Sequence, residues 1–184
     1  MQYDKITADP VRGPEIGRLY LNASPFITTL ARLAYREFAD QVERQFHELT
    51  SCKGVGLTVK VVDVDPYPSA EEMFVSVSHG LLMVYGTSED QGHPLLTPDQ
   101  NDMFRAVHDF HGHYMTGRGF DRHGEEAAWV RHSQMFTGLA RRAMTTETRG
   151  QSSALCWVTS PEFPPQKAIL LPDWVSRIPE RWTI

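Results

Sequence analysis

The stretch FRAVHDFHGHYMTGRGFDRHGEEAAWVRHSQMF, residues 104–136, decides the fold that the sequence predicts. Apolar residues in both of its halves recur at helical spacing, and the glycine-containing run YMTGRGFDRHG between the halves is typical of a turn. The same stretch holds five of the eight histidines of the chain. We therefore expect a helical hairpin, over about 98–149, that carries imidazole groups on facing helices.

Capping signals predict where the two helices of this hairpin begin. Thr97 is a suitable N-cap, Pro98 suits the first turn of a helix, and Gln100 completes a capping-box pattern. The first helix is therefore expected to run from Pro98 to about Phe110. The second helix is expected to open after Gly124 and to continue unbroken to the end of the hairpin, because it contains no proline.

The remaining sequence predicts a single α+β domain over residues 1–184, in which helices dominate. A long amphipathic helix is expected over about 25–49, with Ser24 as its N-cap. A small, antiparallel sheet is expected over about 56–86, from LTVKVVDVD and HGLLMVYG, and an irregular, proline-rich segment over 157–184. The apolar stripe of the long helix consists of Phe26, Leu30, Leu33, Val42, Phe46 and Leu49.

Composition and charge exclude several classes of function. Hydrophobic residues at 41% and charged residues at 22% are ordinary for a soluble globular protein. The net charge of −5 gives no general attraction to phosphate backbones, so a nucleic-acid partner is not expected. No apolar run is long enough to span a membrane, and the start MQYDKITADP lacks a secretory signal, so a cytoplasmic location is expected. Cys52 and Cys156 form no metal-binding pair and are expected to be reduced and structural.

The first helix of the hairpin is expected to turn histidines toward the second. His108 follows the apolar Phe104 by four residues, so its imidazole lies on the face that should be buried. Gly112 weakens the helix, so the chain can turn there and bring His113 back beside His108. Both imidazoles are therefore candidate metal ligands, and His111 is the alternate.

The second helix supplies a carboxylate to the same gap. Glu125 and His132 lie seven residues apart, which is nearly two turns, and share a stripe with apolar side chains. A charged carboxylate that points inward is costly unless a cation partners it. We therefore expect Glu125 to be a metal ligand, with Glu126 as the alternate if the helix is rotated by one residue. His132 is then a fourth ligand or a general base, and Asp109 orients a ligand histidine or takes part in catalysis.

This ligand set predicts a divalent metal and an enzyme that acts on a small molecule. Two histidines and one carboxylate leave coordination positions open, which is typical of non-haem iron(II) oxygenases, so iron(II) is favoured over zinc or manganese. Candidate substrate contacts are Glu147 and Arg149 in MTTETRGQSS, Trp129 as a pocket wall, and Arg118 in TGRG. The simpler reading of Glu147 and Arg149 is an ordinary helix end that Gly150 stops.

The segment TPDQNDMFRAVHDFHGH resembles the iron-binding segment of the pterin-dependent aromatic amino acid hydroxylases. The match consists of His108, Asp109, Gly112 and His113, and it implies that the two histidines bind iron for oxygen chemistry. The ligand carboxylate of that family lies much farther downstream in a longer chain. The resemblance therefore does not extend to a pterin cofactor or to an aromatic amino acid substrate, and Glu125 or Glu126 would have to replace that carboxylate.

A second set of residues resembles the HD-domain phosphohydrolases. His79 in VSVSHGLLMV, the doublet His108-Asp109 and the later run GFDRHGEEA are similar to parts of that metal-binding pattern. The resemblance implies a metal that activates water against a phosphoester. It departs from the family at His79, which lies in a stretch that reads as a strand. The alternatives to an oxygenase are therefore an HD-like phosphohydrolase and a non-catalytic zinc-binding module.

Overall fold

The computed structural model describes residues 2–87 and 92–182. Helices dominate the structure, as the sequence predicts. The main elements in chain order are α1 (Arg12–Asn22), α2 (Thr29–Thr50), β1 (Thr58–Val62), α3 (Ala70–Ser78), β2 (Leu81–Tyr85), α4 (Pro98–His108), α5 (Arg122–Ser133), α6 (Ala140–Thr145) and α7 (Gln151–Ala154). Short π-helical turns occupy Asp109–His113, Thr146–Gly150 and Leu155–Thr159, and 3-10 turns occupy Tyr3–Lys5, Tyr114–Thr116, Asp173–Ser176 and Glu180–Trp182.

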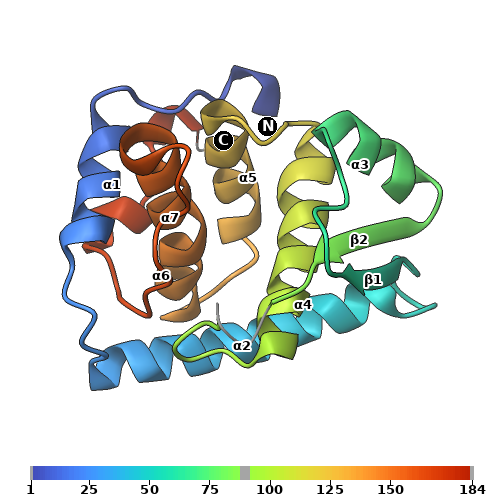
Figure 1. The fold of residues 1–184 in the computed structure, drawn as a ribbon, viewed down its shortest axis with the longest axis horizontal. Coiled ribbons are helices and arrows are strands. Elements are labelled where there is room, and N and C mark those ends of the chain that lie inside the picture. Colours follow the sequence, from blue (N-terminus) through green and yellow to red (C-terminus); the bar gives the residue numbers. More distant parts are fainter. Residues whose placement is uncertain (1, 88–91, 183–184) are drawn as a thin grey trace.

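The long helix α2 forms the base of the molecule. It runs along the bottom of Figure 1, and both α4 and α6 pack against it. The buried ring of Phe38 on α2 lies 5.0 Å from the ring of Phe104 on α4 and 5.4 Å from that of Phe136. This aromatic contact joins α2 to α4 and to the turn that follows α5, so it fixes the positions of α4 and α5 on the base.

The beginning of α2 differs from the prediction. The helix starts at Thr29 rather than near residue 25, because the side chain of Thr28, not Ser24, accepts a hydrogen bond from the Ala31 backbone N–H. Of the predicted apolar stripe, Val42 and Leu49 are buried, whereas the N-terminal members are exposed. The buried face near the start of the helix is formed instead by the smaller Ala31 and Ala34 and by Tyr35 and Phe38. The exposed members of the predicted stripe are Phe26, Leu30 and Leu33.

The sheet has two parallel strands, so the prediction of an antiparallel pair is wrong. Thr58 of β1 pairs with Leu81 of β2, and the register continues to Val62 and Tyr85. The reason is α3, which returns the chain to the starting edge of the sheet between the two strands, as parallel pairing requires. The right side of Figure 1 shows α3 beside the two strands.

Helix α3 was not predicted, because Phe74, Val75 and Val77 have side chains that favour a strand. Its run MFVSVS reads as a strand, yet Ala70, Met73 and Val77 form a buried helical face. A capping signal is present, because the Ser69 side chain accepts a hydrogen bond from the Glu72 backbone N–H. His79 therefore caps a helix and is not part of a strand.

The second helix of the hairpin is also not continuous. It ends at Ser133, and the chain turns before α6, where Gly138 adopts a positive φ of 59°. From Ala140 the helical path then continues through π-helical turns to Thr159, so Gly150 does not stop it. Gly150 serves close packing instead, because a Cβ at this position would lie 2.7 Å from a methyl carbon of Leu171.

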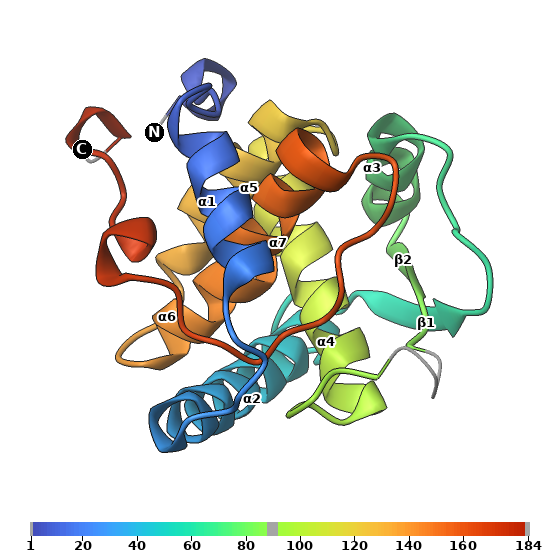
Figure 2. The ribbon, with the colours of Figure 1, turned by 60° about the vertical axis from the view of Figure 1, so that its left-hand side comes forward.

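A second apolar cluster lies where α1 packs against α7. Ile16 and Tyr20 of α1 meet Ala154 of α7 and the buried Leu171 and Val175 of the C-terminal segment. Figure 2 shows α1 in front of α7, with the C-terminal segment passing beside them. That segment is irregular from residue 161 onward apart from its short 3-10 turns, and its last two residues lie outside the described part of the chain. None of the described helices combines the length and the apolar character that a membrane span requires.

Candidate metal centre

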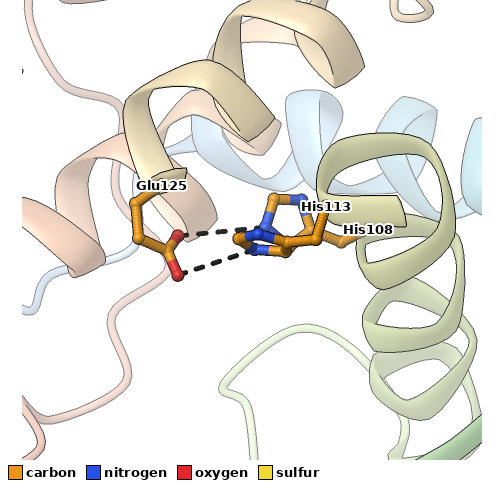
Figure 3. Close-up of side chains that lie close together, drawn as sticks. All are labelled: His108, His113 and Glu125. Atoms are coloured by element: carbon orange, nitrogen blue, oxygen red, sulfur yellow. Dashed lines mark ion pairs between the residues drawn. The ribbon is translucent and has the colours of Figure 1, made fainter. Parts of the chain in front are cut away.

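Three of the predicted ligands lie together in the structure. His108 ends α4, His113 ends the π-helical turn that follows, and Glu125 lies in the first turn of α5. One ligand atom of each lies within 4.8 Å of the others. Glu125 Oε1 is 3.6 Å from His113 Nε2, and Glu125 Oε2 is 4.0 Å from His108 Nε2. Figure 3 shows the carboxylate facing both imidazoles across a narrow gap.

The π-helical turn is what aligns the two histidines. Residues five apart on a regular α-helix point in different directions, because each turn takes 3.6 residues. The wider turn over Asp109–His113 takes more residues and rotates the chain less for each residue, so five residues come closer to one full turn and His113 lies toward the side of His108. The helical path therefore does not end at Phe110 or turn at Gly112, as the sequence had suggested. Short π-helical segments are frequent at functional sites.

The position of Glu125 is set by the cap of α5. The Asp121 side chain accepts hydrogen bonds from the backbone N–H groups of His123, at 2.8 Å, and Gly124, at 2.7 Å. This cap fixes the first helical turn, from which Glu125 points toward the histidines. The two N–H donors also hold the pKa of Asp121 below its usual value.

We expect Asp121→Ala to lower the free energy of unfolding by about 1 kcal/mol, because the helix loses its cap. The charged Asp121 carboxylate is the form that the N–H donors favour, so its contribution is present above the usual aspartate pKa and is lost as pH falls through the lower folded value. Urea unfolding at neutral and acidic pH measures this difference. Asp121→Asn, which retains the acceptor oxygen, should lose less stability; equal losses in both variants would contradict the capping role.

Hydrogen bonds behind the histidines select the tautomers that suit a metal. His113 Nδ1 lies 3.0 Å from the backbone carbonyl of Arg118 and must donate to it, which leaves the Nε2 lone pair toward Glu125. His132 Nε2 lies 2.8 Å from Gln45 Oε1 and donates to it, so His132 Nδ1 is an acceptor. His108 Nδ1, at 3.3 Å, then donates to His132, and the His108 Nε2 lone pair is also left toward Glu125.

Gln45 therefore orients His108 through His132. We expect Gln45→Leu to weaken metal binding by about tenfold while one metal ion still binds, because the His132 N–H loses its acceptor and the tautomer of His108 is no longer fixed. Competition with a chromophoric chelator measures this affinity. An unchanged affinity in a folded variant would show that the hydrogen-bond chain does not act on His108.

Burial keeps the imidazoles neutral and disfavours a free carboxylate. It holds the pKa of both His108 and His113 below the usual histidine value, and it raises the pKa of Glu125 to about 8. Neutral imidazoles are the form that binds metals, and a divalent cation would compensate the charge of the Glu125 carboxylate. The electrostatics of the three residues therefore suit a bound cation.

The three side chains lie on the wall of a cavity of about 360 Å³. Asp109 lies on the same wall, and burial raises its pKa to about 7. The cavity also reaches Glu147, so one of the predicted substrate contacts lines the same space as the three ligands. Its apolar surface comes partly from Tyr67, Tyr85, Phe120, Leu155 and Phe163. This volume is large enough for a small organic molecule.

Two of the predicted histidine ligands lie outside the group. His132 is buried behind His108, and its two ring nitrogens face Gln45 and His108 rather than the gap. His111 stacks on His132, with ring centroids 5.8 Å apart, and does not line the cavity. The structure therefore makes His132 a support for a ligand and does not favour it as a fourth ligand or a general base.

Glu126 and Arg149 form a buried ion pair elsewhere. Arg149 donates from Nε at 2.9 Å and from Nη2 at 2.5 Å to the two oxygens of Glu126, and from Nη1 at 2.8 Å to the Val175 carbonyl. Its guanidinium carbon lies 3.9 Å from the ring centre of the fully buried Trp129. Neither Arg149 nor Trp129 lines the cavity, and the Arg118 side chain instead binds the carbonyls of Tyr3 and Asp4. These predicted substrate contacts are structural.

Three residues of the site surroundings were not predicted: Gln45, Tyr35 and His93. Gln45 and Tyr35 lie on α2, and His93 lies in the connection before α4. Gln45 lies on the buried side of the amphipathic helix α2. Because a buried amide requires a polar partner, this position in the sequence could have indicated a buried hydrogen bond from Gln45. The sequence around His93 carries no comparable pattern, since its partners come from distant segments.

Comparison of the chain with family models, with curated proteins and with solved structures finds no match. The chemistry of the site is therefore inferred from its own residues.

Proposed function

We propose that the protein is a metal-dependent enzyme that acts on a small molecule, with one divalent ion bound by His108, His113 and Glu125. The observation that carries this proposal is the convergence of two imidazole Nε2 lone pairs and one carboxylate on the wall of a cavity. Three protein ligands leave positions open on the cavity side for a substrate or a small co-reactant.

Iron(II) is the favoured metal and oxygen the favoured co-reactant. Two histidines and one carboxylate with open positions are the ligand set of non-haem iron(II) oxygenases. Iron bound there would supply the activation of oxygen. The protein residues would orient the metal ligands. The backbone carbonyl of Arg118 fixes the imidazole of His113, and the ring of His132 fixes that of His108. The apolar cavity wall would limit water around the substrate. Asp109 is placed to exchange a proton with a substrate, because its carboxyl group lines the same cavity.

A zinc-dependent hydrolase is the second candidate. The same ligand set occurs in zinc peptidases, and Asp109 and Glu147 offer carboxylates that could act as a base toward a water in the cavity. A phosphoester is a poor substrate for this cavity, because several acidic residues line it and Arg105 is the one arginine or lysine among the described lining residues. His79, which the phosphohydrolase resemblance requires, is exposed at the end of α3 and does not line the cavity.

A non-catalytic zinc module is less well supported. A structural zinc site has four protein ligands. The described residues offer three here, and His132, the fourth that the sequence had suggested, faces Gln45 and His108.

Oxygen uptake distinguishes these candidates. Protein loaded with iron(II) without air is expected to bind one equivalent, and then to consume oxygen faster than its Glu125→Gln variant when air is admitted. Glu72→Gln, which changes an exposed glutamate on α3, is the matched control and should behave as the wild type. If the zinc form hydrolyses esters and the iron form takes up no oxygen, the hydrolase proposal replaces the oxygenase proposal. If the protein binds no metal, both proposals are wrong.

A further inference from the structure

Glu147 lines the cavity with a buried carboxylate, and one of the two carboxylate oxygens accepts hydrogen bonds. Its Oε1 accepts hydrogen bonds from the hydroxyl of Tyr35 and, at 3.2 Å, from Nε2 of His93. The rings of Tyr35 and His93 stack with centroids 5.0 Å apart, so each holds the other in place. Glu147 is only 6% exposed, and among the described residues its Oε2 has no hydrogen-bond partner. A polar atom on a cavity wall is thus free to meet a ligand.

The partners of Glu147 do not neutralise it. His93 Nδ1 accepts from the backbone N–H groups of Leu95, at 3.1 Å, and Leu96, at 2.9 Å, so that nitrogen carries no proton. With Nε2 donating to Glu147, His93 is the neutral tautomer. Burial and the nearby carboxylate raise the pKa of Tyr35 well above its usual value, so the phenol is neutral as well. Two neutral donors on one oxygen support a carboxylate anion but add no positive charge.

The rest of the cavity wall offers Glu147 no free positive charge. Asp65, Asp109 and Glu125 are acidic residues, His108 and His113 are neutral imidazoles, and Arg105 is the one arginine or lysine among the described lining residues. The Arg105 guanidinium is engaged at the rim, because it donates to the Tyr85 carbonyl and lies 5.9 Å from the ring centre of Tyr85. A divalent ion at Glu125 would compensate the negative charge at that end of the cavity. The charge at Glu147 would remain without a counterion.

We propose that Glu147 binds the protonated amine of a small substrate whose apolar body packs on the aromatic wall of the cavity. An ammonium group supplies the N–H donors and the positive charge that the free Oε2 lacks. Phe120, Phe163 and Leu155 offer the apolar surface for the body of such a molecule. The proposal rests on the proposed function only in taking this cavity as the substrate site; binding of the amine itself requires no metal.

The test compares three probes of equal chain length on metal-free protein: hexylamine, hexan-1-ol and hexanoate. Hexylamine is protonated at neutral pH, as lysine is. NMR titration should show that it binds about tenfold or more tighter than hexan-1-ol, because a hydrogen bond to a charged group is worth more than a neutral one. Hexanoate should bind most weakly. Equal binding of the three, a preference for hexanoate, or no binding of any would overturn the proposal.

Glu147→Gln assigns the preference to this carboxylate. The amide oxygen can still accept from Tyr35 and His93, while its NH₂ group turns toward the cavity, so the preference for hexylamine should be lost. Glu71→Gln, on the exposed face of α3, is the matched control and should retain it. If Glu147→Gln does not fold, Glu147→Asp draws the carboxylate back from the cavity and should reduce the preference. Retained preference in a folded Glu147 variant would refute the assignment.

Glu125→Gln separates this proposal from the metal site. The variant should lose most of its metal binding but retain the preference for hexylamine, because the Glu125 carboxylate contacts the two histidines and not Glu147. Loss of the amine preference together with the metal would show that the amine binds at the metal ligands and not at Glu147. Metal binding without any amine preference would leave the metal site standing and remove only the substrate class.

Discussion

His113→Ala is expected to lower the affinity for a divalent metal by at least about 100-fold, because it removes one of the three proposed ligands, and residues that only support metal ligands are already worth about 10–100-fold. A metal that binds only the folded state stabilises it by about 2.7 kcal/mol at 100 times its Kd. Wild-type protein should therefore melt at a higher temperature when metal is added, and the variant should not respond. Thermal unfolding with and without iron(II) measures both.

His79→Ala is the matched control for this substitution. His79 is an exposed histidine at the end of α3, away from the cavity. This variant should retain the full shift in melting temperature. A normal shift in His113→Ala, or its loss in His79→Ala, would place the metal somewhere other than beside Glu125.

Arg149→Ala is expected to lower the free energy of unfolding by about 3–5 kcal/mol, because it leaves the Glu126 carboxylate buried without its guanidinium partner. The same change also removes the hydrogen bond to the Val175 carbonyl, which ties the C-terminal segment to the helices. Urea unfolding measures the effect. The metal affinity of the remaining folded protein should be unchanged, because Arg149 does not line the cavity.

Two further variants test this structural role. Arg32→Ala removes an exposed arginine from α2 and should change stability by no more than about 0.5 kcal/mol. The double variant Glu126→Met, Arg149→Met should recover much of the stability lost in Arg149→Ala, because no charge is then buried alone. A wild-type stability for Arg149→Ala would contradict the structural role and restore Arg149 as a candidate ligand for a substrate.

The sequence predicted most where local signals are strong. The capping box at Thr97 and Gln100 is present as predicted, because its hydrogen bonds lie within one helical turn. Helical spacing also pointed His108 and Glu125 inward, and in the structure both side chains are partly buried and line the cavity. His113 was assigned to the same gap for an incorrect reason: a π-helical turn, not a chain reversal at Gly112, brings it there.

The sequence predicted least where distant segments decide the structure. The direction of β2 depends on the presence of α3. The valines of α3 favour a strand by local preference, and only the packing of Met73 and Val77 in the core shows that the segment is a helix. The choice between Glu125 and Glu126 also depends on tertiary contacts, because Arg149 arrives from a later helical turn and pairs with Glu126. Local periodicity contains neither contact.

The most direct test of the metal centre is the position of an ion in crystals grown with iron(II) or manganese(II). Anomalous scattering should give a peak about 2.0–2.2 Å from His108 Nε2, His113 Nε2 and a carboxylate oxygen of Glu125, as nitrogen and oxygen ligands require. A peak at His111 and His132, a peak at a surface histidine such as His79, or crystals without any peak at Glu125 would contradict the site.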